Sequence, residues 1–240
     1  MAMYRYVKGV PRQRRIPHAF SFLFIGAGIM LLGWTLWPII TFSVINEPLF
    51  ASIATPLSDT VSVGIKPEGS AGPISNRSNN NTDYTDVNTW FPGKPQKKIV
   101  TPINTYTLSI PRLRIENATV IIAGDDLSEG LVHYGGTPLP GTYGNTVIFG
   151  HSTLPQFYDP KKYKTIFSLL PTLSIGDQIF ILYDGLTYTY TVFDMVVVEP
   201  TDLSPLEQRF DDAYVTLVTC VPPGTYWKRL NVKAKLEKRV

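Results

Sequence analysis

The longest uncharged stretch of the chain runs from Ala19 to Ile45 and reads "AFSFLFIGAGIMLLGWTLWPIITFSVI". As an α-helix these 27 residues would be about 40 Å long at 1.5 Å per residue, which is enough to cross a bilayer. A buried helix of a soluble protein is the alternative, but such helices are seldom apolar on every face over this length. We therefore expect residues 19–45 to form a single transmembrane helix.

The charges on the two sides of this stretch are unequal. Five basic residues and no acidic residue precede it, namely Arg5, Lys8, Arg12, Arg14 and Arg15, whereas Glu47 is the first charge after it. The positive-inside rule places residues 1–18 in the cytoplasm and the rest of the chain outside the cell membrane. A cleaved signal peptide is the alternative, since "SIA" at 52–54 has small residues, but the apolar run is about twice the usual signal core. An uncleaved anchor is favoured.

The region from residue 46 to residue 104 has a different composition, because it is rich in Pro, Gly, Ser and Asn and has no sustained apolar period. Such sequences are typical of flexible linkers, so we expect an extracellular tether between the membrane and a folded domain. Its one aromatic patch is "NTWFPG" at 88–93. Docking of this patch on the domain is possible chemically, but a lone exposed cluster is the favoured interpretation.

From Thr105 to Val240 the chain consists of short β-type runs separated by turn residues. Alternation with period two is clear in "TYTYTVFDM", and only "YKTIFSLL" at 163–170 reads as a helix. Seven or eight strands of this kind predict an all-β closed barrel or sandwich. The net charge of +3 is concentrated before residue 18, and without a basic stripe on this domain we predict no nucleic-acid binding.

The only cysteine, Cys220, ends the run "AYVTLVTC". Proteins in an oxidising compartment usually pair their cysteines or have none, so a single cysteine there is a candidate reactive thiol. A small buried hydrophobic residue is the alternative, and composition alone does not decide between the two.

Two further reactive residues occupy strand ends in the same domain. His151 follows "NTVIFG", and Arg229 begins "RLNVKAKLE". A thiol with a pKa of about 8.5 needs a base or a positive neighbour to act as a nucleophile, and an arginine can stabilise an oxyanion. Cys220, His151 and Arg229 on one barrel rim would therefore suffice for acyl transfer through a thioester.

The remaining histidine of the domain, His133, has two other interpretations. A hydrogen-bonded structural histidine is favoured over a second catalytic group. A metal site built from His133, His151 and Cys220 lacks any close ligand pair such as CxxC, so we predict no bound metal.

Five segments between about residue 105 and residue 240 resemble the sortases, which are cysteine transpeptidases of the bacterial surface. "GTYGNTVIFGH" at 141–151 resembles the family segment that leads to the catalytic histidine, "TLVTC" at 216–220 matches the TLxTC signature, and "KRLNV" at 228–232 supplies the family's arginine. "VHYGGTPLPG" and "FSLLPTLSIGDQIFIL" resemble the segments that precede the histidine strand and the next strand. The five occur in the family's order behind an N-terminal anchor.

The resemblance implies a closed eight-stranded sortase-like barrel with one or two short helices. It also implies that Cys220 attacks the Thr–Gly bond of an LPxTG-like C-terminal sorting signal on a surface protein and forms a thioester. An amine of a peptidoglycan precursor or a pilin lysine would resolve it, with His151 transferring protons and Arg229 polarising the acyl group. No cofactor is implied, and the acidic residues of a calcium site found in some members are not identifiable here.

Departures from the family's pattern bear on its subclass. No Asp-Pro-aromatic lid precedes the barrel and the chain ends in the polar "KAKLEKRV", so we expect an enzyme that anchors proteins to the cell wall rather than a pilin polymerase. Two other functions stay open, namely a non-catalytic surface protein and a cysteine hydrolase that releases its substrate to water.

Overall fold

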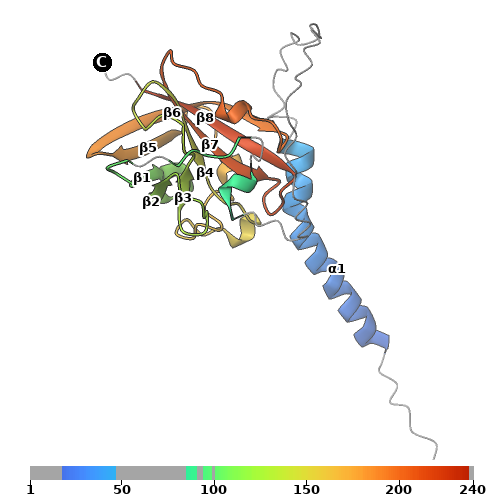
Figure 1. Cartoon of the computed structure of the whole chain (residues 1–240). Coiled ribbons are helices and arrows are strands. Elements are labelled where there is room, and N and C mark those ends of the chain that lie inside the picture. The colour runs from blue at the N-terminus through green and yellow to red at the C-terminus, as the bar shows by residue number, and fades with distance from the viewer. Residues whose placement is uncertain (1–17, 47–84, 91–93, 99–100, 238–240) are drawn as a thin grey trace, which may run out of the picture. The chain divides into compact units, whose positions relative to one another are not determined.

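The computed structural model of the protein describes residues 18–46, 85–90, 94–98 and 101–237. One α-helix is followed by eight strands and short 3₁₀ turns (Figure 1). In chain order the elements are α1 (His18–Thr41), the π-helical turn η1 (Phe42–Asn46), η2 (Val87–Thr89), β1 (Thr105–Ile110), η3 (Pro111–Leu113), β2 (Ile115–Ile122), β3 (Leu131–His133), β4 (Gly144–Phe149), η4 (Pro155–Phe157), η5 (Leu170–Thr172), β5 (Gln178–Tyr183), β6 (Leu186–Val198), η6 (Ser204–Leu206), β7 (Ala213–Val221) and β8 (Lys228–Leu236).

Helix α1 is apolar around its whole circumference. The stretch Phe20–Val44 has 25 residues and a mean hydropathy of 1.9, and its large apolar side chains are mostly exposed. By length and composition this is the one helix among the described residues that can cross a bilayer, and it fits the membrane anchor predicted for residues 19–45. Its orientation stays a prediction.

The eight strands close into a barrel in the order β1-β2-β3-β4-β7-β8-β6-β5. Neighbouring strands are antiparallel except for the parallel pairs β2–β3 and β4–β7. The predicted all-β closed barrel of eight strands is confirmed. Strand β3 was not among the runs read from the sequence, because its three residues are too few to show alternation.

Two apolar cores lie on the two sides of the barrel wall. The larger fills the interior with alternate residues of every strand, such as Leu217 of β7 and Val232 of β8. The smaller lies outside, on the opposite faces of β3, β4 and β7, and consists of Val87, Trp90, Leu127, Val132, Tyr134, Val147, Phe149, Leu206, Val218 and Cys220. All nine residues of β7 are consequently buried. We call the second set the outer core.

The predicted helix at residues 163–170 is wrong. The segment forms successive turns that lead into η5. The Phe167 amide donates to the His151 carbonyl at 3.0 Å, so it is not available for the helical bond to residue 163. Ile166, Phe167 and Leu170 are buried in the barrel core, and this burial holds the segment in place without a regular helix.

The expectation that the aromatic patch at 88–93 is exposed is wrong for Trp90, which is 1% exposed in the outer core. Backbone hydrogen bonds fix the segment that carries it, since the Val87 amide donates to Asp125 and the Leu127 amide to Thr85, each at 3.0 Å. Further along, the Lys97 amide donates to the Gly135 carbonyl at 3.0 Å.

We call residues 85–90 and 94–98 the cover segment. The remainder of the predicted tether, apart from residues 46 and 101–104, lies outside the described residues, as do residues 91–93.

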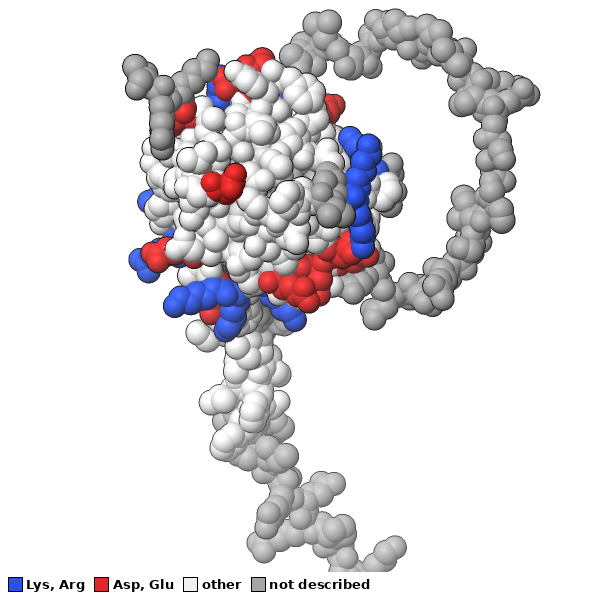
Figure 2. All heavy atoms as spheres, turned by 60° about the vertical axis from the view of Figure 1, so that its left-hand side comes forward, with Lys and Arg blue, Asp and Glu red and all other residues white. Residues whose placement is uncertain are grey.

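Charged side chains form no continuous stripe on the face of the barrel domain that Figure 2 shows. Lys, Arg, Asp and Glu lie mainly around the edge of a broad uncharged centre. Several basic and acidic side chains form exposed ion pairs, such as Lys98 with Asp125 at 3.0 Å and Arg209 with Asp211 at 2.6 Å. Such exposed pairs contribute little to stability.

Candidate active site

Cys220 lies near the end of β7 on the outer face of the barrel. Its neighbours in the strand, Thr219 and Val221, face the other side, and Val221 belongs to the barrel core. Antiparallel pairing places Cys220 directly opposite Arg229 of β8. Cys220 and Arg229 are nine residues apart in the chain, and the connection from Val221 to Lys228 turns the chain back so that the two residues are paired on neighbouring strands.

His151 follows β4 at the level of Cys220. Strands β4 and β7 are parallel with Phe149 opposite Val218, and continuing this register by two residues brings His151 opposite Cys220. Two side-chain hydrogen bonds hold residues 150–152 against β7. Thr219 Oγ1 donates to the Gly150 carbonyl at 2.8 Å, and Ser152 Oγ donates to the Cys220 carbonyl at 2.6 Å.

Gly150 is required for this approach of the two strands to the core. A Cβ atom at this position would lie 2.4 Å from the Phe167 ring, which is far inside van der Waals contact. The absence of a side chain thus lets the backbone pass over Phe167 just before it presents His151.

Arg229 is 2% exposed although its side chain is charged. One terminal nitrogen donates to the Tyr226 carbonyl at 3.2 Å, while the Nε atom is buried and has no hydrogen-bond partner. A buried donor of this kind costs about 1–3 kcal/mol unless a ligand satisfies it. Arg229 therefore has unused capacity to bind a carbonyl or oxyanion.

Trp90 covers the site, a role that its surroundings in the sequence do not predict. Arg229 Cζ lies 4.8 Å from the centre of the indole ring, and the His151 ring centre lies 6.1 Å from it. The ring also packs edge-on against Phe149 at 5.6 Å. One side chain thus contacts both predicted partners of Cys220, so the three predicted site residues lie close together. The aromatic patch at 88–93 was the available signal.

The cover leaves the thiol buried and protonated. Cys220 is 1% exposed, and burial raises its pKa from 9.0 to about 11, although the positive Arg229 acts in the opposite direction. The nucleophile must be ionised and must contact a substrate carbonyl, and neither condition holds in this arrangement. Displacement of the cover segment would therefore be required before Cys220 could act as a nucleophile.

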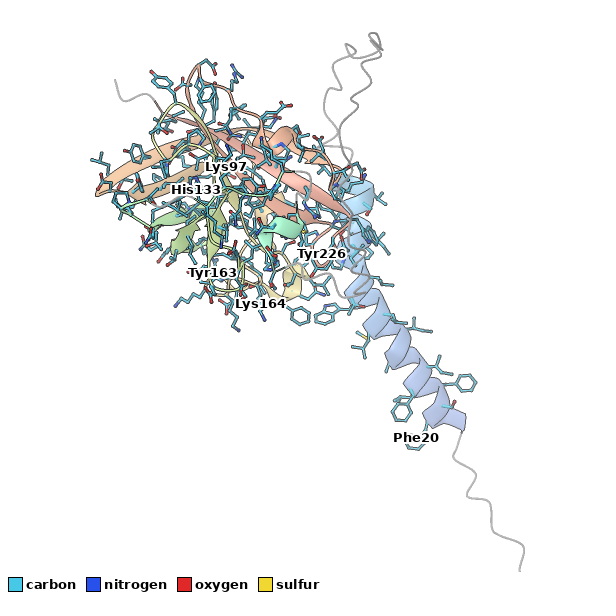
Figure 3. The ribbon with its side chains drawn as sticks, viewed as in Figure 1. Phe20, Lys97, His133, Tyr163, Lys164 and Tyr226 are labelled. Carbon is cyan, nitrogen blue, oxygen red and sulfur yellow. The ribbon has the colours of Figure 1, made fainter. Side chains whose placement is uncertain are left out.

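His133 does not belong to this site. It lies on the interior side of β3, where Nδ1 pairs with the Tyr106 hydroxyl at 2.9 Å and Nε2 with Thr137 Oγ1 at 3.1 Å. Burial lowers the His133 pKa to about 4, so the ring is neutral. Figure 3 shows it well apart from Tyr226, whose carbonyl contacts Arg229. Within the described ranges no three His, Cys, Asp or Glu side chains are placed to bind a metal ion, and the His133–His151–Cys220 alternative has no geometric support.

Comparison with known proteins identifies the barrel. The family model described as the sortase domain matches residues 108–237. Sortase D of Bacillus subtilis (strain 168) is 28% identical over 118 residues, which are 48% of this chain, and the chain spans about half (53%) of the length of that relative.

Two solved structures are also similar. A lid mutant of sortase A from Corynebacterium diphtheriae is 30% identical with a TM-score of 0.50, over 59% of this chain and 74% of that one. A pilus-related sortase C of Group B Streptococcus is 30% identical with a TM-score of 0.50, over 58% of this chain and 70% of that one.

Removing the indole ring of Trp90 should expose the thiol. We expect Trp90→Ala to raise the rate of Cys220 alkylation by a small iodoacetamide probe at least about tenfold, because the ring lies against both neighbours of the thiol, and to cost about 3–5 kcal/mol of stability. Trp227→Ala is the matched control, since Trp227 is 62% exposed and its removal should leave both quantities nearly unchanged. Equal alkylation rates in Trp90→Ala and the wild type would contradict the assignment of Trp90 as the cover.

The raised pKa of Cys220 should appear in the pH dependence of stability. Between pH 9.0 and about 11 the folded chain keeps a proton that the unfolded chain has lost. The contribution of the neutral Cys220 thiol to the free energy of unfolding is therefore complete below pH 9.0. It is lost as the pH rises toward 11, at up to roughly 1.4 kcal/mol per pH unit. Denaturant unfolding of the wild type should therefore lose stability faster over this range than Cys220→Ala, in which tyrosine titration is the same. Parallel pH profiles would count against a buried, neutral thiol.

Proposed function

Because this chain belongs to the sortase family, we propose that it is a membrane-anchored cysteine transpeptidase that acts on surface proteins bearing a C-terminal sorting signal. The observation that carries the proposal is the pairing of Cys220 with Arg229 on adjacent strands, with His151 just beyond the end of the neighbouring strand β4 and near the level of Cys220. A buried cysteine without a function would need neither an adjacent buried arginine nor an adjacent histidine.

The first step forms a thioester. The Cys220 sulfur attacks the Thr carbonyl carbon of an LPxTG-like signal while His151 accepts the thiol proton. The carbonyl oxygen gains negative charge in the tetrahedral intermediate, and the Arg229 guanidinium stabilises it electrostatically. The C–N bond to Gly then breaks, and His151 returns the proton to the departing amine. The reaction needs no cofactor.

The second step is the reverse with a different amine. An amino group attacks the thioester carbonyl, His151 takes its proton, and the Cys220 thiolate leaves and is reprotonated. The substrate protein ends in a new amide bond. We propose that the amine belongs to a peptidoglycan precursor or a pilin lysine, so that the product is a protein attached to the cell wall.

Opening of the cover segment makes the thiol reactive. Burial is the largest cause of the raised Cys220 pKa, and departure of Trp90 would remove much of this burial while Arg229 stays paired with Cys220 across the two strands. The nearby positive charge then favours the thiolate. Access and activation thus come from the same movement.

The proposed location follows from α1. The helix fits a single membrane span, and the basic residues before it favour a cytoplasmic N-terminus. The barrel then lies outside the membrane, in the compartment where surface proteins and cell-wall precursors meet.

The test is mass spectrometry of the detergent-solubilised chain after incubation with an LPxTG-type peptide library and a primary amine. We expect a thioester on Cys220 and an amide product, and neither from Cys220→Ala. His151→Ala and Arg229→Ala should each lower the acylation rate by about 10²–10³, because each removes a group that acts in the transition state.

Two outcomes would count against the proposal. Hydrolysed peptide without any amide would indicate a cysteine hydrolase. A library that yields no Cys220-dependent adduct would remove the enzymatic function and leave a non-catalytic surface barrel.

A further inference from the structure

Strands β7, β8 and β6 carry side chains across the outer face of the barrel in aligned rows. Residues opposite one another in the ladder share a row, and rows on the same face follow at every second residue. The first row holds Cys220, Arg229 and Val198, the second holds Val218, Asn231 and Val196, and the third holds Thr216, Lys233 and Asp194.

Asn231, in the second row, is a buried amide whose oxygen is unused. The residue is 1% exposed, and its Oδ1 atom has no hydrogen-bond partner. Three buried side-chain nitrogen or oxygen atoms lack a partner among the described residues, and two of them are Asn231 Oδ1 and Arg229 Nε. The two unsatisfied atoms therefore belong to side chains only two residues apart on β8.

The fold offers no reason for an amide at this position. The neighbours of Asn231 in its row are Val218 and Val196, whose side chains form no hydrogen bonds. An apolar residue would be more stable here, because an unsatisfied buried polar group costs about 1–3 kcal/mol. A polar residue that destabilises the resting fold is the pattern expected of a ligand-binding residue.

The spacing of the pair fits an extended peptide. Residues two apart on a strand are about 6.6–6.8 Å apart, and the backbone N–H and C=O groups on one side of an extended chain repeat at the same distance. Arg229 has a free donor and Asn231 a free acceptor. A peptide whose carbonyl meets Arg229 would thus bring its next same-side polar groups to Asn231.

The side of Cys220 on which the acyl part of the peptide lies follows from the position of a cavity next to the rows. A cavity of about 380 Å³ lies at the third row, which is next to the row of Asn231, and is lined by Thr216 and Lys233 of that row and by Ser204 and Glu207 of the segment between β6 and β7. On the other side of Cys220, β7 ends and the exposed side chains of Tyr226 and Trp227 follow. The acyl part of a substrate, which stays bound through both steps, has its room on the Asn231 side.

We propose that the Asn231 carboxamide hydrogen-bonds the main chain of the sorting-signal peptide, on the acyl side and two residues from the carbonyl held by Arg229. This inference rests on the proposed transpeptidase function and adds a substrate-positioning residue to it. Asn231 contacts the bound peptide and not the reacting atoms, so it governs the binding of the signal and not the chemical step.

The test uses Asn231→Leu, which keeps the size of the side chain and removes its hydrogen bonds. For an LPxTG-type peptide that acylates the wild-type full chain, we expect KM to rise about tenfold, which corresponds to one lost hydrogen bond, while kcat stays within about twofold. The melting temperature should be unchanged or higher, because the unsatisfied amide is gone. Asn231→Ala should show the same rise in KM and serves if the leucine variant folds poorly.

Thr137→Val is the matched control. It also removes a buried polar group of similar shape, but this hydroxyl is bonded, to His133 Nε2 at 3.1 Å and to the Tyr134 carbonyl at 2.8 Å. It should lower the melting temperature and leave KM unchanged. Two results would overturn this inference and leave the proposed function intact. One is an active Asn231→Leu variant with the KM of the wild type, and the other is an Asn231→Leu variant that, like Thr137→Val, only loses stability. A wild type that forms no thioester would overturn the proposed function and this inference with it.

Discussion

Burial of β7 on both faces is the constraint on which the site depends. One face belongs to the barrel core, as in any strand of a small barrel. The other face would be solvent-exposed if Trp90, Val87 and Leu206 did not cover it. Backbone pairing of β7 with β4 and β8 places Cys220, His151 and Arg229 on one rim, and the second burial keeps that rim in a water-poor environment.

The same burial keeps the Cys220 thiol unreactive in this structure. A thiol excluded from water stays protonated, and Trp90 occupies the space in which a substrate would contact the Arg229 guanidinium. Contact between the guanidinium and the indole ring is worth about 1–2 kcal/mol when desolvated, so it opposes opening without preventing it. The buried Arg229 Nε and Asn231 Oδ1 atoms have no hydrogen-bond partner while the cover segment is in place, which destabilises this arrangement. A bound peptide would supply the missing hydrogen bonds. The balance between the guanidinium–indole contact and the unsatisfied atoms would set the fraction of molecules in which the cover segment is open.

Much of the fold and of the candidate site could be predicted from the sequence, because the signals lie in short contiguous stretches of the chain. Alternation in β6 and the turn residues between runs predict an all-β domain, and the segments ending in Cys220 and His151 predict a shared rim. Trp90 was misjudged because its burial depends on Asp125, Leu127 and β4, which are distant in the sequence and give no periodic signal around residue 90. The helix at 163–170 was misjudged for a similar reason, since a tertiary hydrogen bond from Phe167 to His151 replaces the helical one.

The proposed function requires the cover segment to leave the outer core when a sorting signal occupies the site. Amide hydrogen exchange on the full chain, with and without a peptide trapped on Cys220, tests this directly. We expect the amides of Val87, Trp90 and Lys97, which are hydrogen-bonded in the free chain, to lose protection in the trapped complex while those of β7 keep it. Unchanged protection of these three amides in the trapped complex would contradict it.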